Sequence, residues 1–227
     1  MKTIIYFKGV YDTLDLFTDH LIEAFESMGY GTFVYHTANE EVCKKMLLRL
    51  LDESQEFAVV TFNNLGYNLS FEQSEAAEDE EKKPEEHNIW NYFHIPYIDI
   101  LMDHPFHYEK PLCNMPETAV ILCTDRNHVK YIRRFFKNIH QTDFLPHAGV
   151  ELGHKHKPLN DRNIDVLYAG ALPIYTVAKM IPDLHSIPEV DGEHMMQSVL
   201  GELVQHPEQT TEQVIEAYVK SVRGDIS

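Results

Sequence analysis

Apolar runs and amphipathic segments alternate along the first part of the chain. Short runs rich in β-branched and aromatic residues predict strands at Thr3 to Phe7, Tyr30 to His36 and Phe57 to Phe62. Between these strands, apolar positions recur with helical spacing from Leu14 to Phe25 and from Val42 to Leu51. This order of elements predicts a parallel sheet with right-handed crossovers.

The same alternation continues to about residue 145. Further strands are predicted at Tyr97 to Met102, Thr118 to Cys123 and His140 to Leu145. Helices are predicted at Asn88 to Phe93 and Asn127 to Phe136. Because several of the strands are apolar almost throughout, we expect them to be covered on both faces. The predicted fold class is therefore α/β, a Rossmann-like parallel sheet with helices on both faces, followed by a helical C-terminal tail.

The pattern changes near residue 164. One more strand is predicted at Ile164 to Ala169, and prolines separate the segments that follow it. Those segments are predicted to be helices, at about 177–181, 192–204 and 211–222. We therefore expect a Rossmann-like domain over residues 1–163. Residues 164–227 would form one strand and a helical tail, the remnant or the start of a second domain.

One strongly acidic segment interrupts the first domain. Glu72 to Glu86 contains eight acidic residues against Lys82 and Lys83. Such a segment buries too little apolar area to order itself, so we expect a mobile surface loop over residues 72–87. The alternative is an arm that docks on a basic partner.

Overall composition narrows the function classes. The 227 residues carry a formal net charge of −17, which argues against nucleic acid and anionic membrane surfaces as partners. No run approaches the roughly 18 apolar residues of a membrane-spanning helix, and we expect no signal peptide. The three cysteines are scattered and form no CxxC motif, as is typical of a protein of the reducing cytoplasm.

Familiar nucleotide-binding motifs are also missing. The first predicted strand is followed by Lys8 to Asp12 rather than by a GxGxxG turn, and no Walker sequence occurs. We therefore expect no bound cofactor.

Polar residues follow several of the predicted strands directly. In open α/β sheets ligands bind outside the carboxyl ends of the strands, and these ends share one edge in a parallel sheet. Carboxylates and imidazoles at such an edge suit proton transfer or the binding of sugar hydroxyls. The candidate residues at these strand ends are Asn63, Asn64, Asp103, His104, His107, Asp125, Arg126, His147 and Gly149.

Each candidate also has a purely structural interpretation. Asp125 can cap the helix that follows it. Asp103 can cap its turn with the histidines packed against it, and His147 can satisfy a loop. Metal binding is a further alternative, either at Asp103, His104 and His107 in a metal-dependent hydrolase, or weakly at His154 and His156.

Several ordered motifs resemble one protein family. The chain contains YDTLDLFTDHLIEAFESMGY, LMDHPFHY, AVILCTDRNHVKYIRRFF, FLPHAGVE and RNIDVLYAGAL, in this order. Over roughly residues 1 to 172 they resemble the bacterial glycosyltransferases of the CgeB-like (spore-maturation-protein type) group. The resemblance implies GT-B architecture, in which two Rossmann-like domains face each other across a cleft. The first domain holds the acceptor and the second binds the nucleotide-sugar donor.

The resemblance also implies sugar transfer without an obligatory metal, with an Asp or His as general base. Asp103 or His104 would be that base, and the other candidates would line the cleft. Some 55 residues follow the last motif, and they contain no glycine-rich turn of the kind that binds a donor. We therefore expect the acceptor-side domain of a GT-B-like glycosyltransferase, which binds a sugar or glycan acceptor. The alternative is a non-catalytic module that binds a glycan or a protein partner.

Overall fold

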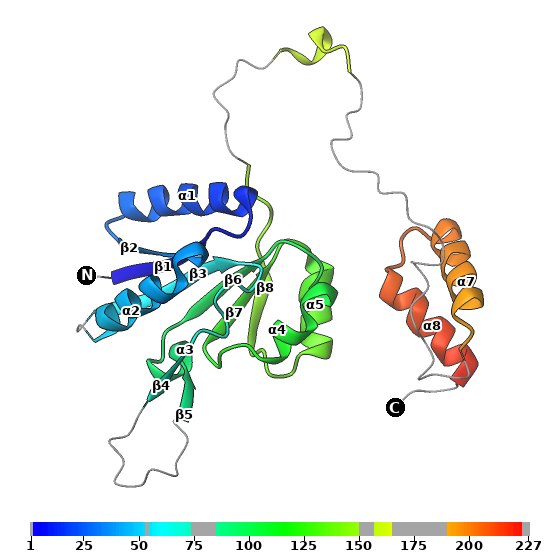
Figure 1. Ribbon diagram of the computed structural model, residues 1–227. Helices are drawn as coiled ribbons and strands as arrows, with labels where there is room; N and C mark the ends of the chain where they lie inside the picture. Colours follow the sequence, from blue (N-terminus) through cyan, green and yellow to red (C-terminus); the bar gives the residue numbers. More distant parts are fainter. Residues whose placement is uncertain (1, 53–54, 74–84, 150–156, 165–189, 224–227) are drawn as a thin grey trace. The chain divides into compact units, whose positions relative to one another are not determined.

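The computed structural model describes residues 2–52, 55–73, 85–149, 157–164 and 190–223. The chain divides into two compact units, Met1–Gly153 and His154–Ser227. Figure 1 labels the helices and strands of both units.

A six-stranded sheet forms the centre of the first unit (Figure 1). Its strand order is β2-β1-β3-β6-β7-β8, and every neighbouring pair is parallel. The strands are β1 (Lys2–Lys8), β2 (Gly31–His36), β3 (Glu56–Phe62), β6 (Tyr97–Leu101), β7 (Ala119–Cys123) and β8 (Gln141–Phe144). The predicted α/β class with a parallel sheet is thus confirmed.

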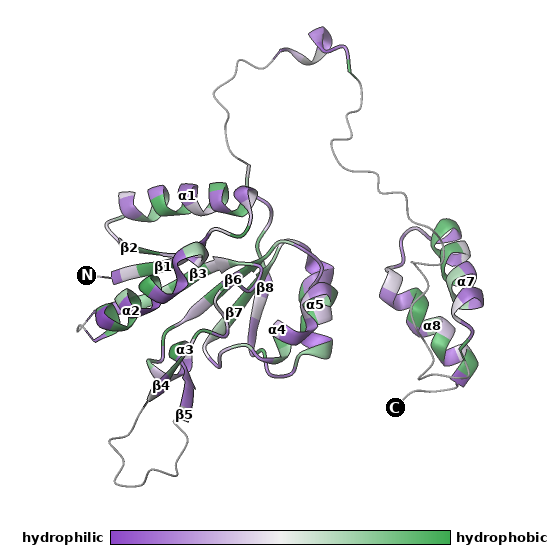
Figure 2. Ribbon diagram, viewed as in Figure 1, coloured by the Kyte–Doolittle hydropathy of each residue, from purple (hydrophilic) through white to green (hydrophobic). Residues whose placement is uncertain are grey.

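Helices cover both faces of this sheet. α1 (Asp12–Ser27) packs on one face, against the side of β1 that carries Ile4 and Tyr6. The other face, which carries Ile5 and Phe7, meets four helices. They are α2 (Glu40–Leu51), α3 (Ile89–Tyr92), α4 (Glu109–Cys113) and α5 (Arg126–Phe135). Coverage from both sides explains why the central strands β1, β3, β6 and β7 are largely apolar rather than alternating. Figure 2 shows this as hydrophobic stretches along β6 and β7.

Two short 3-10 helices complete the connections of this unit. η1 (Thr37–Asn39) joins β2 to α2, and η2 (Pro105–Tyr108) follows β6. η2 begins at Pro105, because His104 takes the extended conformation that a following proline favours and its side chain accepts a hydrogen bond from the Phe106 N–H.

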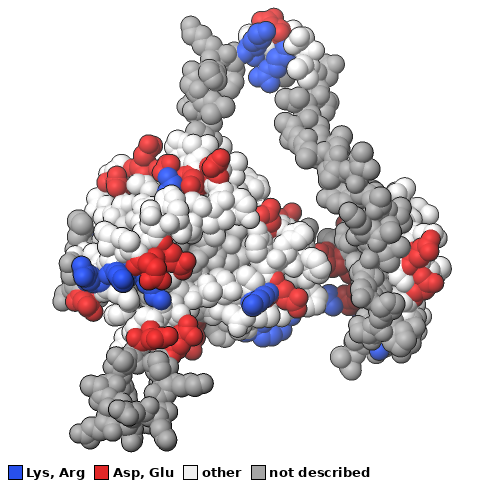
Figure 3. Space-filling view, in the orientation of Figure 1, with Lys and Arg blue, Asp and Glu red and all other residues white. Residues whose placement is uncertain are grey.

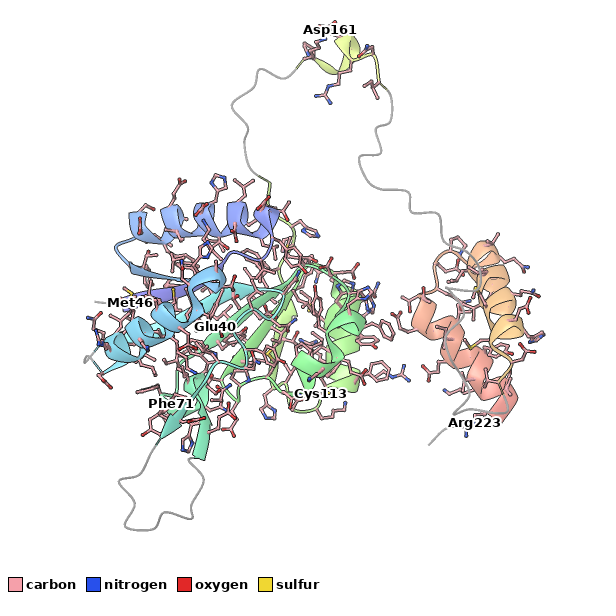
Figure 4. The ribbon with its side chains drawn as sticks, in the orientation of Figure 1. Glu40, Met46, Phe71, Cys113, Asp161 and Arg223 are labelled. Carbon is pink, nitrogen blue, oxygen red and sulfur yellow. The ribbon has the colours of Figure 1, made fainter. Side chains whose placement is uncertain are left out.

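The structure differs from the sequence prediction at both ends of the acidic segment. β4 (Ser70–Gln73) and β5 (Glu85–Asn88) pair as an antiparallel hairpin, so these residues are strand rather than loop. The reason is a set of aromatic contacts that hold the two strands and that a count of charged residues does not reveal. The Phe71 ring lies 5.0 Å from the Tyr92 ring and 5.9 Å from the His87 ring. Figure 4 labels Phe71 at this hairpin. The rest of the predicted loop, 74–84, lies outside the described residues.

The second unit contains a helical pair. α7 (Gly192–Gln205) and α8 (Thr211–Arg223) match the two predicted C-terminal helices, and a short 3-10 helix, η3 (Leu159–Asp161), precedes them. Asp191 caps α7 by accepting hydrogen bonds from the Glu193 and His194 N–H groups. The strand predicted from Ile164 to Ala169 and the helix predicted at 177–181 lie outside the described residues. Among the helices that the structure describes, none combines the length and the hydropathy needed to cross a membrane.

Candidate functional site

The strand order places the end of β3 at the point where the chain reverses direction across the sheet. From β1 the chain moves outward to β2 and then returns past β1 to β3. The segments that leave β1 and β3 therefore go to opposite faces, α1 to one face and α3 to the other. Ligands of open α/β sheets bind at such a reversal, outside the carboxyl ends of the strands. Asn63 and Asn64 follow β3 directly and so lie at this point.

Three polar side chains converge at this edge of the sheet. The Asn63 Nδ2 donates to Asp103 Oδ2 over 2.9 Å, and the Tyr108 hydroxyl donates to the same oxygen over 2.9 Å. The Asn63 Oδ1 accepts a hydrogen bond from the backbone N–H of Met102 over 2.8 Å. Asn63 thereby joins the end of β3 to the end of β6, and Asp103 receives two donors on one oxygen.

The properties of Tyr108 suit its role as a donor. Burial raises the pKa of the Tyr108 hydroxyl, and its hydrogen bond to the Asp103 carboxylate raises it further. The hydroxyl therefore keeps its proton near neutral pH and continues to donate to Asp103. The Asp103 side chain is exposed, and its second oxygen has no hydrogen-bond partner among the described residues.

A buried carboxylate lies beneath this cluster. Asn63 and Asn64 both adopt the left-handed region, with φ of 48° and 65°. The Asn64 N–H donates to Asp99 Oδ1 over 2.9 Å, and this bond holds the turn in place. Asp99 is 0% exposed, and burial raises its pKa to about 7 although the Asn64 N–H opposes the shift. The Asp99 Oδ2 and both polar atoms of the Asn64 side chain have no partner among the described residues.

An apolar hollow of about 310 Å³ lies at the same edge, on the face covered by α1. Phe62 and Met102 line it, and they directly precede Asn63 and Asp103. Two candidate residues from the sequence, His147 and Gly149, also line the hollow. Its remaining lining is Phe17, His20, Leu21, Ile100, Thr124, Leu145, Pro146 and Ala148. The polar side chains of this lining are therefore two histidines and one threonine.

Four of the predicted site residues have local structural roles or stand apart. Asp125 accepts a hydrogen bond from the Asn127 N–H over 2.6 Å and caps α5. The Arg126 guanidinium lies 4.1 Å from the centre of the Phe144 ring. The ring of His104 packs edge-on against His128 and Tyr131 of α5, at 4.7 and 5.0 Å. His107 is exposed on η2 beside Phe106.

Sequence reasoning missed two residues of this site. Tyr108 stands five positions after Asp103, and the turn of η2 brings its hydroxyl back to that carboxylate. Nothing but that spacing could have indicated the contact. Asp99 gave a clearer signal, because a single carboxylate inside an otherwise apolar strand has to be buried with a partner.

Within the described ranges, no group of three or more His, Cys, Asp or Glu side chains is placed to hold a metal ion. His154 and His156 lie outside those ranges.

Comparison with known proteins identifies no match for this chain. No family model matches the chain, no curated protein matches it, and no solved structure matches it.

Proposed function

We propose that the sheet unit is the acceptor-side domain of a GT-B-like glycosyltransferase and that Asp103 is its general base. One observation carries the proposal. The Asp103 carboxylate stands at the carboxyl end of β6 with two donors on Oδ2 and none among the described residues on its other oxygen. A carboxylate held in this way has one oxygen fixed and one oxygen ready to accept a proton.

The proposed step is sugar transfer from a nucleotide-sugar donor. Oδ1 of Asp103 accepts the proton of the acceptor hydroxyl as that oxygen forms its bond to the anomeric carbon, and the nucleoside diphosphate leaves with the electron pair of the bond that breaks. Asn63 and Tyr108 hold the plane of the carboxylate throughout. The hollow beside Phe62 and Met102 receives the body of the acceptor. His147 and Gly149 line that part of the site.

A pair of matched variants tests the role of Asp103. Transfer or donor hydrolysis is measured with a set of nucleotide sugars, on this chain and on the chain supplemented with a donor-binding domain. Asp103→Asn should lower turnover at least about 100-fold, the usual contribution of a general base, while acceptor affinity changes little. Asp125→Asn is the control, because it makes the same chemical change at the next strand end and asparagine also caps helices well. Equal turnover of the two variants would disprove the proposal.

A non-catalytic glycan-binding module is the second candidate. The same observation favours it in part, because an amide, a carboxylate and a hydroxyl beside an apolar hollow can bind a sugar without reacting with it. Turnover separates the two functions. Sugar transfer by the chain supplemented with a donor-binding domain, lost in Asp103→Asn, supports the enzyme, whereas isothermal titration that shows glycan binding without any transfer supports the module.

A further inference from the structure

One carboxyl group of the sheet unit lies wholly inside it. Figure 3 shows acidic side chains on the surface of this unit. Asp99 is not one of these, because it is 0% exposed, and within the described ranges it is the only acidic side chain that is buried. It lies on β6 between Tyr97 and Leu101 and shares their side of the sheet, which four helices cover. Burial of an ionisable group without a charged partner destabilises a fold, so this position calls for a functional explanation.

The titratable groups that the structure describes near Asp99 are neutral at pH 7. Three side chains interact electrostatically with its carboxylate, namely Tyr97 on β6, Tyr108 on η2 and Cys123 on β7. Burial raises the pKa of each of the three, so all keep their protons near pH 7. Tyr67, in the connection after β3, interacts in turn with Tyr97. The Asp, Glu, Lys and Arg side chains of α4 and α5 are exposed, and His128 of α5 packs against His104.

Asp99 holds the turn that follows β3 through one backbone hydrogen bond. The Asn64 N–H donates to Asp99 Oδ1 over 2.9 Å. Asn63 and Asn64 both have left-handed backbone angles, which cost free energy in residues with a side chain, so the turn needs its neighbours to hold it. Further along the turn, the Tyr97 hydroxyl donates to the Leu65 carbonyl over 2.7 Å, a bond between neutral groups. The bond to Asp99 differs, because ionisation of Asp99 adds a full charge to its acceptor.

A single peptide unit connects this bond to the candidate base. The N–H of Asn64 belongs to the same planar group as the carbonyl carbon of Asn63. The orientation of that plane sets the backbone of Asn63, whose side chain donates to Asp103 Oδ2 and accepts the Met102 N–H. A movement of the Asn64 N–H relative to Asp99 therefore also moves the amide that holds the Asp103 carboxylate.

We propose that Asp99 is a positioning residue for Asp103, and that loss of its proton tightens the turn after β3 and so fixes the Asp103 carboxylate. The ionised form accepts a charge-assisted hydrogen bond from the Asn64 N–H, and such bonds are roughly twice as strong as neutral ones. Burial raises the pKa of Asp99 to about 7, so the change takes place in the neutral range. The effect on turnover rests on the proposed function, whereas the coupling between the two carboxyl groups does not.

Polar atoms beside this bond suit a carboxyl group that both gains and loses a proton. Asp99 Oδ2 and the side-chain Oδ1 and Nδ2 of Asn64 are buried and have no partner among the described residues. A buried polar atom without a partner costs free energy. The Asn64 amide offers an acceptor for the proton of the neutral acid and a donor for the carboxylate, and a half-turn of the amide exchanges the two. The pair of Asp99 and Asn64 therefore has one arrangement for each protonation state.

An NMR titration of the full chain without substrate tests the coupling. The carboxyl carbon of Asp99 reports its own protonation, and the side-chain amide signals of Asn63 report the contact with Asp103. Both should titrate with one midpoint near pH 7. The Asn64 N–H signal should move downfield with them, because its hydrogen bond strengthens as Asp99 ionises. Asn63 signals that do not follow the titration of Asp99 would overturn the inference, whatever the transfer activity of the protein.

Asp99→Asn separates this titration from that of the histidines that follow Asp103. Asparagine keeps an acceptor for the Asn64 N–H but has no proton to release, so the Asn63 signals should lose their midpoint near pH 7. A titration caused by the histidines would persist in this variant. Asp143→Asn is the matched control, because it makes the same chemical change at an exposed position of β8, and it should leave the Asn63 titration unchanged. Asn63 signals that titrate alike in Asp99→Asn and the parent would refute the coupling.

The pH dependence of turnover tests the catalytic consequence. With a donor-binding domain supplied, turnover of the parent should rise about fivefold as Asp99 ionises, because a bond to a carboxylate replaces a bond to a neutral acid. Asp99→Asn should lack this rise and stay near the lower value. A pH profile parallel to that of the parent would indicate a structural role alone and contradict the proposal. Absence of transfer at every pH would contradict the proposed function, and the NMR titration would then decide the inference by itself.

Discussion

Asn63 and Asp103, 40 positions apart in the sequence, are joined by a hydrogen bond of 2.9 Å between Nδ2 and Oδ2. The other end of the same amide accepts the Met102 N–H over 2.8 Å. One side chain therefore fixes both the backbone and the carboxylate at the end of β6. The geometry of the candidate base depends on this single amide as much as on the sheet itself.

Replacing Asn63 by alanine should cost about 2 to 3 kcal/mol of stability. The variant loses both hydrogen bonds, and alanine at φ of 48° carries the strain of the left-handed region. Urea unfolding measures the change. Asn68→Ala is the control, because Asn68 is exposed in the same connection, and it should shift stability by less than about 0.5 kcal/mol. Similar losses for the two variants would contradict this view of the turn.

Stability should fall as pH rises from about 4 to about 7, with Asp99 as one source. The folded-state pKa of Asp99 is about 7 against an ordinary value of 3.8, so the folded protein keeps a proton that the unfolded chain releases in this interval. The stabilisation is complete below pH 4 and is lost as pH approaches 7. Asp99→Asn removes the titration, so its stability relative to the parent should increase with pH across this window.

Urea unfolding at several pH values between 4 and 8 makes that comparison. Asp143→Asn supplies the control, since Asp143 is exposed on β8. The stability of Asp99→Asn relative to the parent should rise with pH more steeply than that of Asp143→Asn. If the two variants show the same pH dependence, the buried carboxyl does not titrate as described.

Two glycines with similar backbone angles should respond very differently to alanine. Gly66 has φ of 77°, and a methyl group added there would overlap the Phe7 ring. Gly29 has φ of 87°, but an added methyl group would meet open space. Gly66→Ala should therefore cost roughly 3 kcal/mol or more, and Gly29→Ala only about 1 kcal/mol from backbone strain. Equal melting temperatures of the two variants in thermal unfolding would refute the clash at Phe7.

Asp125 should stabilise the protein through the hydrogen bond that its oxygen accepts and not through its charge. Its Oδ1 caps α5 at the Asn127 N–H, so Asp125→Ala should cost about 1 kcal/mol. Asp125→Asn keeps the acceptor and should change stability by a few tenths of a kcal/mol. Chemical denaturation distinguishes these outcomes, and equal losses in the two variants would argue for an electrostatic role instead.

The sequence was sufficient to predict the sheet, because most of its strands are largely apolar on both sides and helices separate most of them. Tyr97 to Met102 and Thr118 to Cys123 end within one residue of the observed β6 and β7. The same pattern placed Asn63, Asp103 and His147 at one edge of the sheet. Local periodicity is enough for such features since each depends only on neighbours in the chain.

The division of roles at that edge could not be predicted. Asp103 and Asp125 look alike in sequence, each following an apolar strand. The Asp103 carboxylate accepts a hydrogen bond from Asn63, which follows a distant strand. The Asp125 carboxylate instead caps the helix that follows it. That difference arises from tertiary contacts, which spacing along the chain does not contain. The hairpin of β4 and β5 escaped prediction for the same reason, because its anchor is the contact between Phe71 and Tyr92.

The register of that hairpin sets Glu72 directly opposite Glu86. Like charges that face each other across two strands repel, so this pair works against the ladder that brings it together. Added salt should therefore slow amide hydrogen exchange in β4 and β5 while leaving the central strands unaffected. The stability of the hairpin would then depend on ionic strength, because cations screen the repulsion between these two carboxylates.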